Sequence, residues 1–357
     1  MSDFWSQAGA GNRSNGSRTI QKAVNLALQG GGSHGAFAWG VLDRLLEDER
    51  LAIEGISGTS AGAINAAVLA QGYLKGGATG ARAALDSFWH RLSEIGWLSP
   101  VHRGWFERAM GTWNLDASPS SILVDQLSHL VSPYQLNPLN LSPLRDLLAD
   151  MLDWKALNAA DAIKLYITAT NVETGRSRIF ARHELTLDAL LASACLPQIF
   201  QAVVIDGVPY WDGGYMGNPS IWPLIYNCGS RDVIVVEINP LTRKGVPRTA
   251  AEITNRLNEI TFNASLMREM RAIAFAERLI EADGKHPAVE RLKKMLIHMI
   301  EAEEAMEELG VASKLNTDLD FLLYLKELGR RTTGRWLERH FAALGHHSSL
   351  DIRKVFL

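Results

Sequence analysis

A serine between very small residues is the part of this sequence that could do chemistry most directly. The stretch Gly58-Thr59-Ser60-Ala61-Gly62 matches G-x-S-x-G, a pattern in which a tight turn between a strand and a helix exposes the serine hydroxyl. Such a turn holds the serine in a sparsely populated backbone conformation, so its neighbours must be small to avoid clashes. The pattern predicts Ser60 as a nucleophile, with Gly58 and Gly62 making room for it.

A second glycine-rich turn, Gly30-Gly31-Gly32-Ser33-His34-Gly35, follows the apolar residues 24–28. Three consecutive glycines leave no side chains to block the backbone N–H groups, which can then stabilise a developing oxyanion. Residues 36–46 have helical spacing, so the positive end of a helix would lie beside the loop. We therefore expect Gly30, Gly31 and Gly32 to form an oxyanion hole for an acyl transfer at Ser60.

The same glycines also fit a dinucleotide fold. Gly30, Gly32 and Gly35 satisfy G-x-G-x-x-G between a strand and a helix, and Glu54 lies near the spacing of a ribose-binding acid. This alternative predicts a nucleotide- or phosphate-binding protein that hydrolyses nothing. The strand after the first helix should then end in an acid, whereas here it ends in the Ser60 turn. The serine hydrolase interpretation is preferred for that reason.

A nucleophilic serine needs a base, and late histidines are the first candidates. A Ser-Asp-His order would require a histidine in a loop near the carboxyl ends of the strands. The histidines of the last third lie in or beside polar helical segments, and we expect them to be solvated: His286, His298, His340, His346 and His347.

Asp212 is the other candidate base. It follows two short strands, residues 203–205 and 208–211, that are joined by an Asp-Gly turn, and it precedes Gly213 and Gly214. Its simpler alternative role is that of a turn cap. An aspartate with a pKa of about 3.9 is a poor base, so the role requires partial burial. The apolar neighbours Tyr210, Trp211 and Tyr215 are candidates to provide it.

The three motifs together resemble those of bacterial patatin-like phospholipases, which carry G-G-G-x-[RK]-G, G-x-S-x-G and D-G-[GA] in this order. The resemblance covers roughly residues 20–240 and includes flanking stretches: residues 168–175, residues 193–197 with Phe200, and Asn218-Pro219. It implies a Ser60–Asp212 dyad without histidine, an oxyanion hole in the glycine loop, and a lipid or ester substrate, with no metal or cofactor.

The glycine loop departs from the family pattern at two positions. His34 stands where the family has Arg or Lys, and Gln29 replaces an acid that often precedes the glycines. The backbone donors of Gly31 and Gly32 are unaffected. The loop loses a fixed positive charge, because a histidine with a pKa of about 6.5 is mostly neutral at pH 7. Neutral esters are thus as plausible as phospholipids, and the activity is of phospholipase A or carboxylesterase type.

The chain alternates apolar strands with helical stretches, which predicts a layered α/β core flanked by helices. The expected strands are residues 24–28, 51–57, 164–170 and 232–238, and a helix is expected at 61–73. We expect a flexible leader at 1–19, a hydrolase core at 20–240 and a helical region at 241–357. An inserted helical region at about 75–160 is rich in tryptophan: Trp89, Trp97, Trp105, Trp113 and Trp154. This region could line an acyl-chain pocket, or its aromatic side chains could pack in the core.

The C-terminal region has helical periodicity at residues 250–282, 288–309 and about 319–328. These helices could cover the core, form a homo-oligomer, or lie on a membrane, and packing on the core is the default for an amphipathic helix. On a membrane, the contact would involve Arg291, Lys293 and Lys294 with the apolar residues Leu292, Met295, Leu296 and Ile297.

Composition narrows the function further. The 357 residues carry a formal charge of -3, which gives no electrostatic case for nucleic acid. The two cysteines, Cys195 and Cys228, lack metal or redox spacing and are expected in the core. Residues 1–18 do not resemble a secretory signal, and no segment is apolar enough to cross a bilayer. We expect a cytoplasmic protein, with peripheral membrane contact as an alternative.

Overall fold

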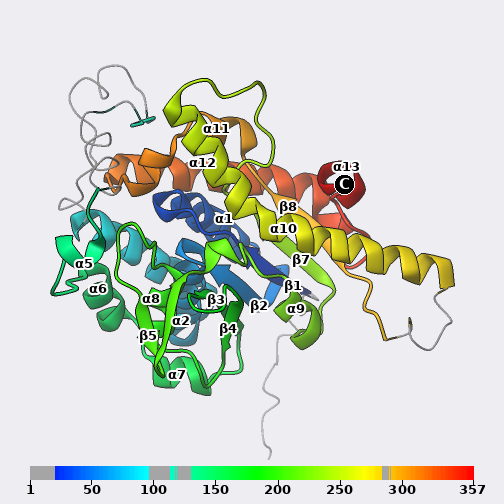
Figure 1. Ribbon diagram of the computed structural model, residues 1–357. Coiled ribbons are helices and arrows are strands. Elements are labelled where there is room, and N and C mark those ends of the chain that lie inside the picture. The colour runs from blue at the N-terminus through cyan, green and yellow to red at the C-terminus, as the bar shows by residue number, and fades with distance from the viewer. Residues whose placement is uncertain (1–20, 96–112, 117, 119–129, 284–288, 290) are drawn as a thin grey trace, which may run out of the picture.

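The computed structural model describes residues 21–95, 113–116, 118, 130–283, 289 and 291–357 (Figure 1). The expected leader at 1–19, Trp97, Trp105 and His286 lie outside these ranges. The strands are β1 Lys22–Leu28, β2 Leu51–Thr59, β3 Lys164–Asn171, β4 Ser177–Ala181, β5 Val203–Ile205, β6 Val208–Asp212, β7 Asp232–Val236 and β8 Leu296–Ile300.

The helices cover the faces and edges of the sheet (Figure 1). The α-helices are α1 Gly35–Glu47, α2 Ala61–Ile95, α5 Pro133–Leu136, α6 Pro143–Met151, α7 Trp154–Ala159, α8 Leu187–Ser193, α9 Trp222–Asn227, α10 Ala250–Asp283, α11 Glu303–Glu307, α12 Leu319–His340 and α13 Ile352–Phe356. Short 3₁₀ helices are η1 Gly32–His34, η3 Gly213–Tyr215, η4 Val311–Leu315 and η5 Phe341–Ala343. Helix α2 is kinked at Gly76 and Gly77, where the backbone leaves helical geometry.

The central sheet has eight strands in the order β5-β6-β3-β2-β1-β7-β8, with β4 also paired to β3. Strands β3, β2, β1, β7 and β8 are parallel, whereas β4, β5 and β6 are antiparallel additions on one side. In register, Leu28 lies beside Gly58, and Thr59 lies beside Thr168. The carboxyl ends of β1 and β2 therefore meet at one edge of the sheet, and the glycine loop and the Ser60 turn both begin there.

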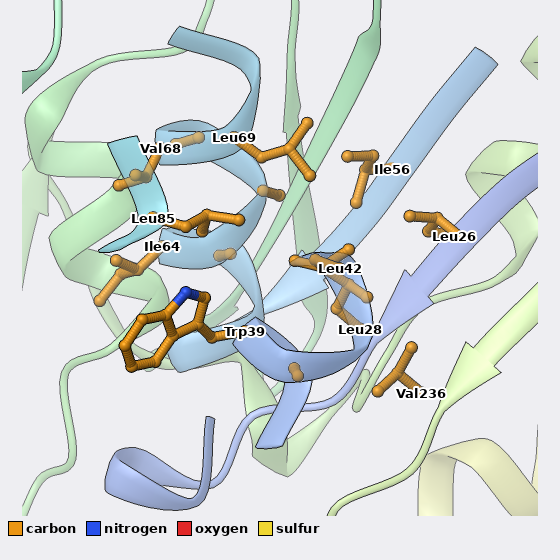
Figure 2. Packing of buried hydrophobic residues seen from close by; sticks show 14 of the residues in the cluster. Leu26, Leu28, Trp39, Leu42, Ile56, Ile64, Val68, Leu69, Leu85 and Val236 are labelled. Atoms are coloured by element: carbon orange, nitrogen blue, oxygen red, sulfur yellow. The ribbon is translucent and has the colours of Figure 1, made fainter. Parts of the chain in front are cut away.

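Alternating side chains of the strands fill two separate cores, because successive residues of a strand point to opposite faces. Leu26 and Leu28 of β1 and Ile56 of β2 pack against Trp39 and Leu42 of α1 and against the apolar face of α2 (Figure 2). The intervening Ala27 belongs to the opposite core. There α10 packs on the strands through its buried side chains Leu266, Met270 and Ile273. The result is a layered α/β/α protein, as the alternation of elements predicts.

The C-terminal region packs on the core. Helix α12 lies against α1, with Phe321, Leu322 and Leu325 fully buried between them, and Arg330 of α12 forms ion pairs with Asp43 and Glu47 of α1. Because α12 and α10 cover opposite faces of the sheet, the default expectation of packing on the core is confirmed for both. The predicted division at residue 240 stays a prediction, although β8 extends the sheet beyond it.

The helix expected at residues 288–309 is wrong. Residues 296–300 form β8, which pairs in parallel with β7, and only the short helix α11 follows. Met295, Leu296 and Ile297 are buried, so this part of the suggested membrane contact is inside the protein. A run of six apolar or aromatic residues fits a buried strand as well as a helix, and length alone favours the strand. Within the described residues, no helix is long and apolar enough to span a bilayer.

The described tryptophans of the insertion belong to the packed interior. Trp89 stacks on Trp39 of α1, and Trp113 stacks on Tyr324 of α12. Trp154 is partly buried against the same core. These contacts favour ordinary packing for the three residues rather than an open acyl-chain pocket. Both cysteines, Cys195 and Cys228, are buried free thiols, as expected.

Candidate active site

Ser60 lies in the turn between β2 and α2, and its backbone is left-handed, with a φ of 53°. Few residues other than glycine adopt this conformation, and at a nucleophile it marks a strained elbow. A Cβ atom added to Gly58 would lie 2.6 Å from the Gly62 carbonyl oxygen. A Cβ atom added to Gly62 would collide with the Leu28 carbonyl oxygen. The small residues of the motif are thus required by close approach of the backbone.

The glycine loop lies directly against this elbow. A Cβ on Gly30 would lie 2.6 Å from the Cβ of Ser60, and one on Gly35 would lie 2.6 Å from that of Ala61. The Gly30 N–H donates to Asn218 Oδ1 at 2.6 Å, so it is occupied, unlike the free donor expected there. No hydrogen bond is seen for the N–H groups of Gly31 and Gly32 in the part of the chain that the structure describes. These two remain available to an oxyanion.

Asp212 is brought to Ser60 by strand β3. Thr168 of β3 lies beside Thr59, and the next residue, Ala169, pairs with Asp212 at the end of β6. Ser60 and Asp212 therefore flank β3 at the same level of the sheet. The Asp212 backbone is fixed by its N–H to the Cys195 carbonyl at 2.8 Å, and its own carbonyl accepts from Thr170 Oγ1 at 2.8 Å.

The two carboxylate oxygens of Asp212 differ. Oδ1 accepts the Gly214 N–H at 2.7 Å, as in a turn cap, and the Asp212 side chain is fully buried. Oδ2 has no hydrogen-bond partner among the described residues. The Ser60 hydroxyl lies close enough to lower the pKa of Asp212 without meeting the geometry of a hydrogen bond to Oδ2. The capping role of Oδ1 and an oxygen without a partner among the described residues thus occur in the same carboxylate.

Burial raises the pKa of Asp212 to about 7, against the opposing effects of the Gly214 N–H, the Ser60 hydroxyl and Lys314. A buried carboxylate loses hydration, which penalises its charged form. The nearby rings are Tyr215, whose pKa the charge on Asp212 helps to raise, and Phe262, which contacts both Tyr215 and Gly214. An aspartate with a pKa near 7 can both accept and return a proton at neutral pH.

Ser193 is a part of the site that the sequence did not identify by role. Its Oγ, at the end of α8, accepts the N–H of Ser60 at 2.9 Å and so holds the elbow in place. The sequence carried a signal for it, because Ser193 begins the stretch that resembles the segment leading to the acid.

Gln29 is a second supporting residue. Its Oε1 accepts the N–H groups of Ile238 and Asn239, and its Nε2 donates to the Asn218 carbonyl and to Asn263 Oδ1. All of these groups are buried, and a neutral amide supplies both donors and acceptors for them. Gln29 therefore ties the end of β1 to the residues that follow β7 and to the middle of α10, directly before the glycine loop.

The remaining motif residues lie around the same edge. Gly213 and Gly214 form η3 after Asp212, and a Cβ on Gly213 would collide with the Thr168 carbonyl. His34 is buried, and its Nε2 lies 2.7 Å from Ser313 Oγ. Burial and then the charge of Lys314 lower the pKa of His34 to about 3, so it is neutral.

Glu54 lies at the opposite end of the sheet from the glycine loop. It accepts the N–H groups of Gly229 and Ser230 and pairs with Lys164 at the start of β3. A ribose-binding acid would have to lie at the carboxyl end of its strand. Glu54 therefore has a structural role, which removes the residue that favoured a dinucleotide site.

His298 is not the solvated histidine expected from the sequence. It lies in β8 fully buried, with Nε2 3.0 Å from Asp232 Oδ1 and Nδ1 2.9 Å from Ser349 Oγ. This chain of groups resembles a Ser-His-Asp arrangement, but β1 and β7 separate β8 from β2. Three strand spacings place it about 14 Å from Ser60 across the sheet. His346 and His347 are exposed as expected, and His340 is half-buried.

We expect His298→Ala to destabilise the protein without removing hydrolysis. The change deletes two buried hydrogen bonds and should lower the free energy of unfolding by about 1–3 kcal/mol. His346→Ala, at an exposed position, is the matched control and should change it by less than about 0.5 kcal/mol. Urea denaturation measures both. Loss of hydrolysis in a folded His298→Ala variant would make this histidine the base.

Two solved bacterial protein structures are similar to this chain at low sequence identity. VipD from Legionella pneumophila is similar over 90% of this chain and 67% of its own, with 15% identity and a TM-score of 0.38. ExoU, in its complex with SpcU from the type III secretion system of Pseudomonas aeruginosa, is similar over 90% of this chain, with 17% identity and a TM-score of 0.33. This chain spans 53% of the length of that ExoU chain.

No curated protein matches the sequence. The model of the patatin-like phospholipase family matches residues 26–225, which is more than half of the chain. That range begins in β1, contains the glycine loop, the Ser60 elbow and Asp212, and ends within α9. This chain belongs to the patatin-like phospholipase family.

Proposed function

We propose that this protein is a lipid acyl hydrolase, of phospholipase A or carboxylesterase type, that uses a Ser60–Asp212 dyad. The observation that carries the proposal is the environment of Asp212. Its carboxylate is fully buried, has one oxygen without a partner among the described residues, and has a pKa of about 7 beside a serine on a strained elbow. A turn cap alone would need only the bond from Gly214.

The reaction would proceed in two acyl transfers. Asp212 accepts the Ser60 proton as Oγ attacks the ester carbonyl, and the resulting tetrahedral intermediate expels the alcohol, which takes the proton from Asp212. Water then attacks the acyl-enzyme by the same path and releases the carboxylic acid, which restores Ser60. One residue serves as base and then as acid in each half, which suits a pKa close to neutral.

The N–H groups of Gly31 and Gly32 are the proposed donors to the oxyanion. Gly30 has a different task in this scheme, since its N–H is taken by Asn218 and its missing side chain lets Ser60 approach the loop. The N terminus of α1 follows within a few residues and adds a favourable dipole.

Membership of a phospholipase family favours a lipid ester as the substrate. His34 supplies no charge for an anionic head group, so neutral esters are equally compatible with the loop. A phospholipid substrate would be met at a membrane surface, so we propose transient peripheral contact with the bilayer. A homo-oligomer stays a prediction.

Gly31→Val is expected to reduce turnover by about 100- to 1,000-fold, the usual effect of losing one oxyanion donor. Its Cβ would lie 2.9 Å from Ile238 Cγ2, so the loop must shift. Gly76→Val is the matched control, because that glycine lies in the α2 kink with no atom within 4 Å of an added Cβ, and it should retain activity.

Release of free fatty acid from phosphatidylcholine vesicles and of p-nitrophenol from a short-chain ester measures these rates. Hydrolysis of both substrates supports a phospholipase, and hydrolysis of the soluble ester alone supports a carboxylesterase. No hydrolysis of either, together with phosphate or nucleotide binding that Gly31→Val removes, would favour the non-hydrolytic alternative. Full activity of a folded Gly31→Val variant would exclude the loop from the mechanism.

A further inference from the structure

Lys314 brings a positive charge from the C-terminal region to the proposed active site. It lies in η4, which packs on the glycine loop: a Cβ on Gly32 would collide with the Lys314 carbonyl oxygen, and Gly32 has a left-handed φ of 58°. Asp116 fixes the start of η4, because its Oδ1 accepts the N–H of Ala312 at 3.0 Å. The backbone of η4 thus forms one wall of the glycine loop.

The ammonium group of Lys314 points into the protein. Nζ donates to Asn239 Oδ1 and to Asn258 Oδ1, both at 2.8 Å, and it lies 5.4 Å from the ring centroid of Phe262. Lys314 as a whole residue is half-buried, whereas Asn239 and Phe262 are buried. A lysine held in this way is anchored at its charged end.

Two short paths connect this ammonium group to the catalytic groups. Asn239 uses its Oδ1 for Lys314, and its Nδ2 donates to the Gly30 carbonyl at 2.9 Å, so the lysine fixes the orientation of the amide that holds the loop. On the other side, Phe262 packs against Gly214, whose N–H binds Asp212 Oδ1. The charge of Lys314 also lowers the pKa of Asp212.

His34 cannot take over this electrostatic role. The Ser313 hydroxyl donates to the Gly310 carbonyl at 2.7 Å, so its oxygen must accept a hydrogen bond from the N–H at His34 Nε2. The lowered pKa of His34 makes this donor neutral. Ser313, the partner of His34, directly precedes Lys314, so two adjacent residues of η4 contact the glycine loop.

The other charged groups around Lys314 partly compensate one another. Glu259 of α10 faces it and pairs with Arg243 and Arg256. Asp116 and Asp212 raise the pKa of Lys314, whereas burial is the larger effect and lowers it to about 8. Lys314 is thus still mostly charged at pH 7. Around Asp212, the other titratable neighbours are Cys195 and Tyr215.

We propose that Lys314 is a positioning residue of the active site, whose ammonium group holds the glycine loop through Asn239 and stabilises the negative charge of Asp212 as the base. The inference rests on the proposed function of Ser60 and Asp212, and it assigns a part of the C-terminal region to the chemistry of the core. Without that charge, Asp212 would keep its proton to a higher pH.

The test compares two substitutions that separate charge from hydrogen bonding. Lys314→Gln keeps donors for the asparagine oxygens and removes the charge, and Lys314→Arg keeps the charge but does not titrate. Lys326→Gln is the matched control, since Lys326 of α12 also lies over an aromatic ring, that of Trp39 in α1, but it pairs with Asp86 rather than with the groups of the glycine loop. The readout is kcat/KM against pH on a soluble p-nitrophenyl ester, with folding checked by circular dichroism.

For the unaltered protein we expect kcat/KM to rise through a pH of about 7 as Asp212 loses its proton and to fall above about 8 as Lys314 loses its own. Lys314→Gln should shift the acidic limb upward by up to about 1 pH unit and abolish the alkaline fall, because it removes the positive charge that lowers the pKa of Asp212. Lys314→Arg should keep the acidic limb and lose the alkaline fall. Lys326→Gln should match the unaltered protein.

If both limbs of the kcat/KM–pH profile of Lys314→Gln lie at the same pH as in the unaltered protein, Lys314 is only a structural residue and the inference is overturned. This holds whatever the maximum value of kcat/KM. If Lys314→Gln does not fold, Lys314→Arg decides, because an alkaline fall that persists in that variant contradicts the assignment. Inactivity of the unaltered protein on every ester would instead contradict the proposed function, so the two failures are distinguishable.

Discussion

Replacing Ser60 with alanine is expected to lower ester turnover by at least about 10,000-fold while leaving the fold intact. Alanine fits an elbow whose neighbours are Gly58, Ala61 and Gly62, and the change removes only the nucleophilic oxygen. Turnover on a p-nitrophenyl ester measures the loss, and circular dichroism reports the fold.

Ser349→Ala is the matched control for this change. Ser349 Oγ lies 2.9 Å from the buried His298, which also pairs with Asp232, so it is the serine of the triad-like group at β8. We expect Ser349→Ala to retain most of the activity. The reverse result, an active Ser60→Ala variant and an inactive Ser349→Ala variant, would place the active site at Ser349 and His298, beside β8.

Asp212→Asn is expected to reduce turnover by about 10,000-fold, because it preserves shape and removes the proton acceptor. The amide oxygen can still accept the Gly214 N–H, so the turn should survive. Asp232→Asn is the control, since Asp232 is also a buried aspartate but pairs with His298 far from Ser60. Near-normal turnover per folded molecule in Asp212→Asn would show that another group accepts the Ser60 proton.

The strands and turns of the core could be predicted because local signals agree with the tertiary structure there. The apolar run at 24–28, the Asp206-Gly207 turn and the small residues around Ser60 each favour or permit locally the conformation that the fold requires. The motifs also predicted which side chains meet at the edge: Ser60 directly follows β2 and Asp212 ends β6, and these two strands flank β3.

Residues that act through tertiary contacts left no such signal. Lys314 lies in a short 3₁₀ helix about 280 residues after the glycine loop, and nothing local distinguishes it from a surface lysine. His298 was expected to be solvated because residues 288–309 were expected to form a polar helical segment, whereas β8 places it between Asp232 and Ser349. The occupied N–H of Gly30 depends on Asn218, which is remote in sequence.

Covalent labelling tests the central claim most directly. A fluorophosphonate reacts with a serine only when a base activates it and an oxyanion site accepts the phosphoryl oxygen. Peptide mass spectrometry of the labelled full chain should find the adduct on Ser60, with stoichiometric labelling at pH 8, strong loss at pH 5 where Asp212 is protonated, and none in Ser60→Ala. An adduct on another serine, or an unlabelled Ser60 in folded protein at pH 8, would contradict the account.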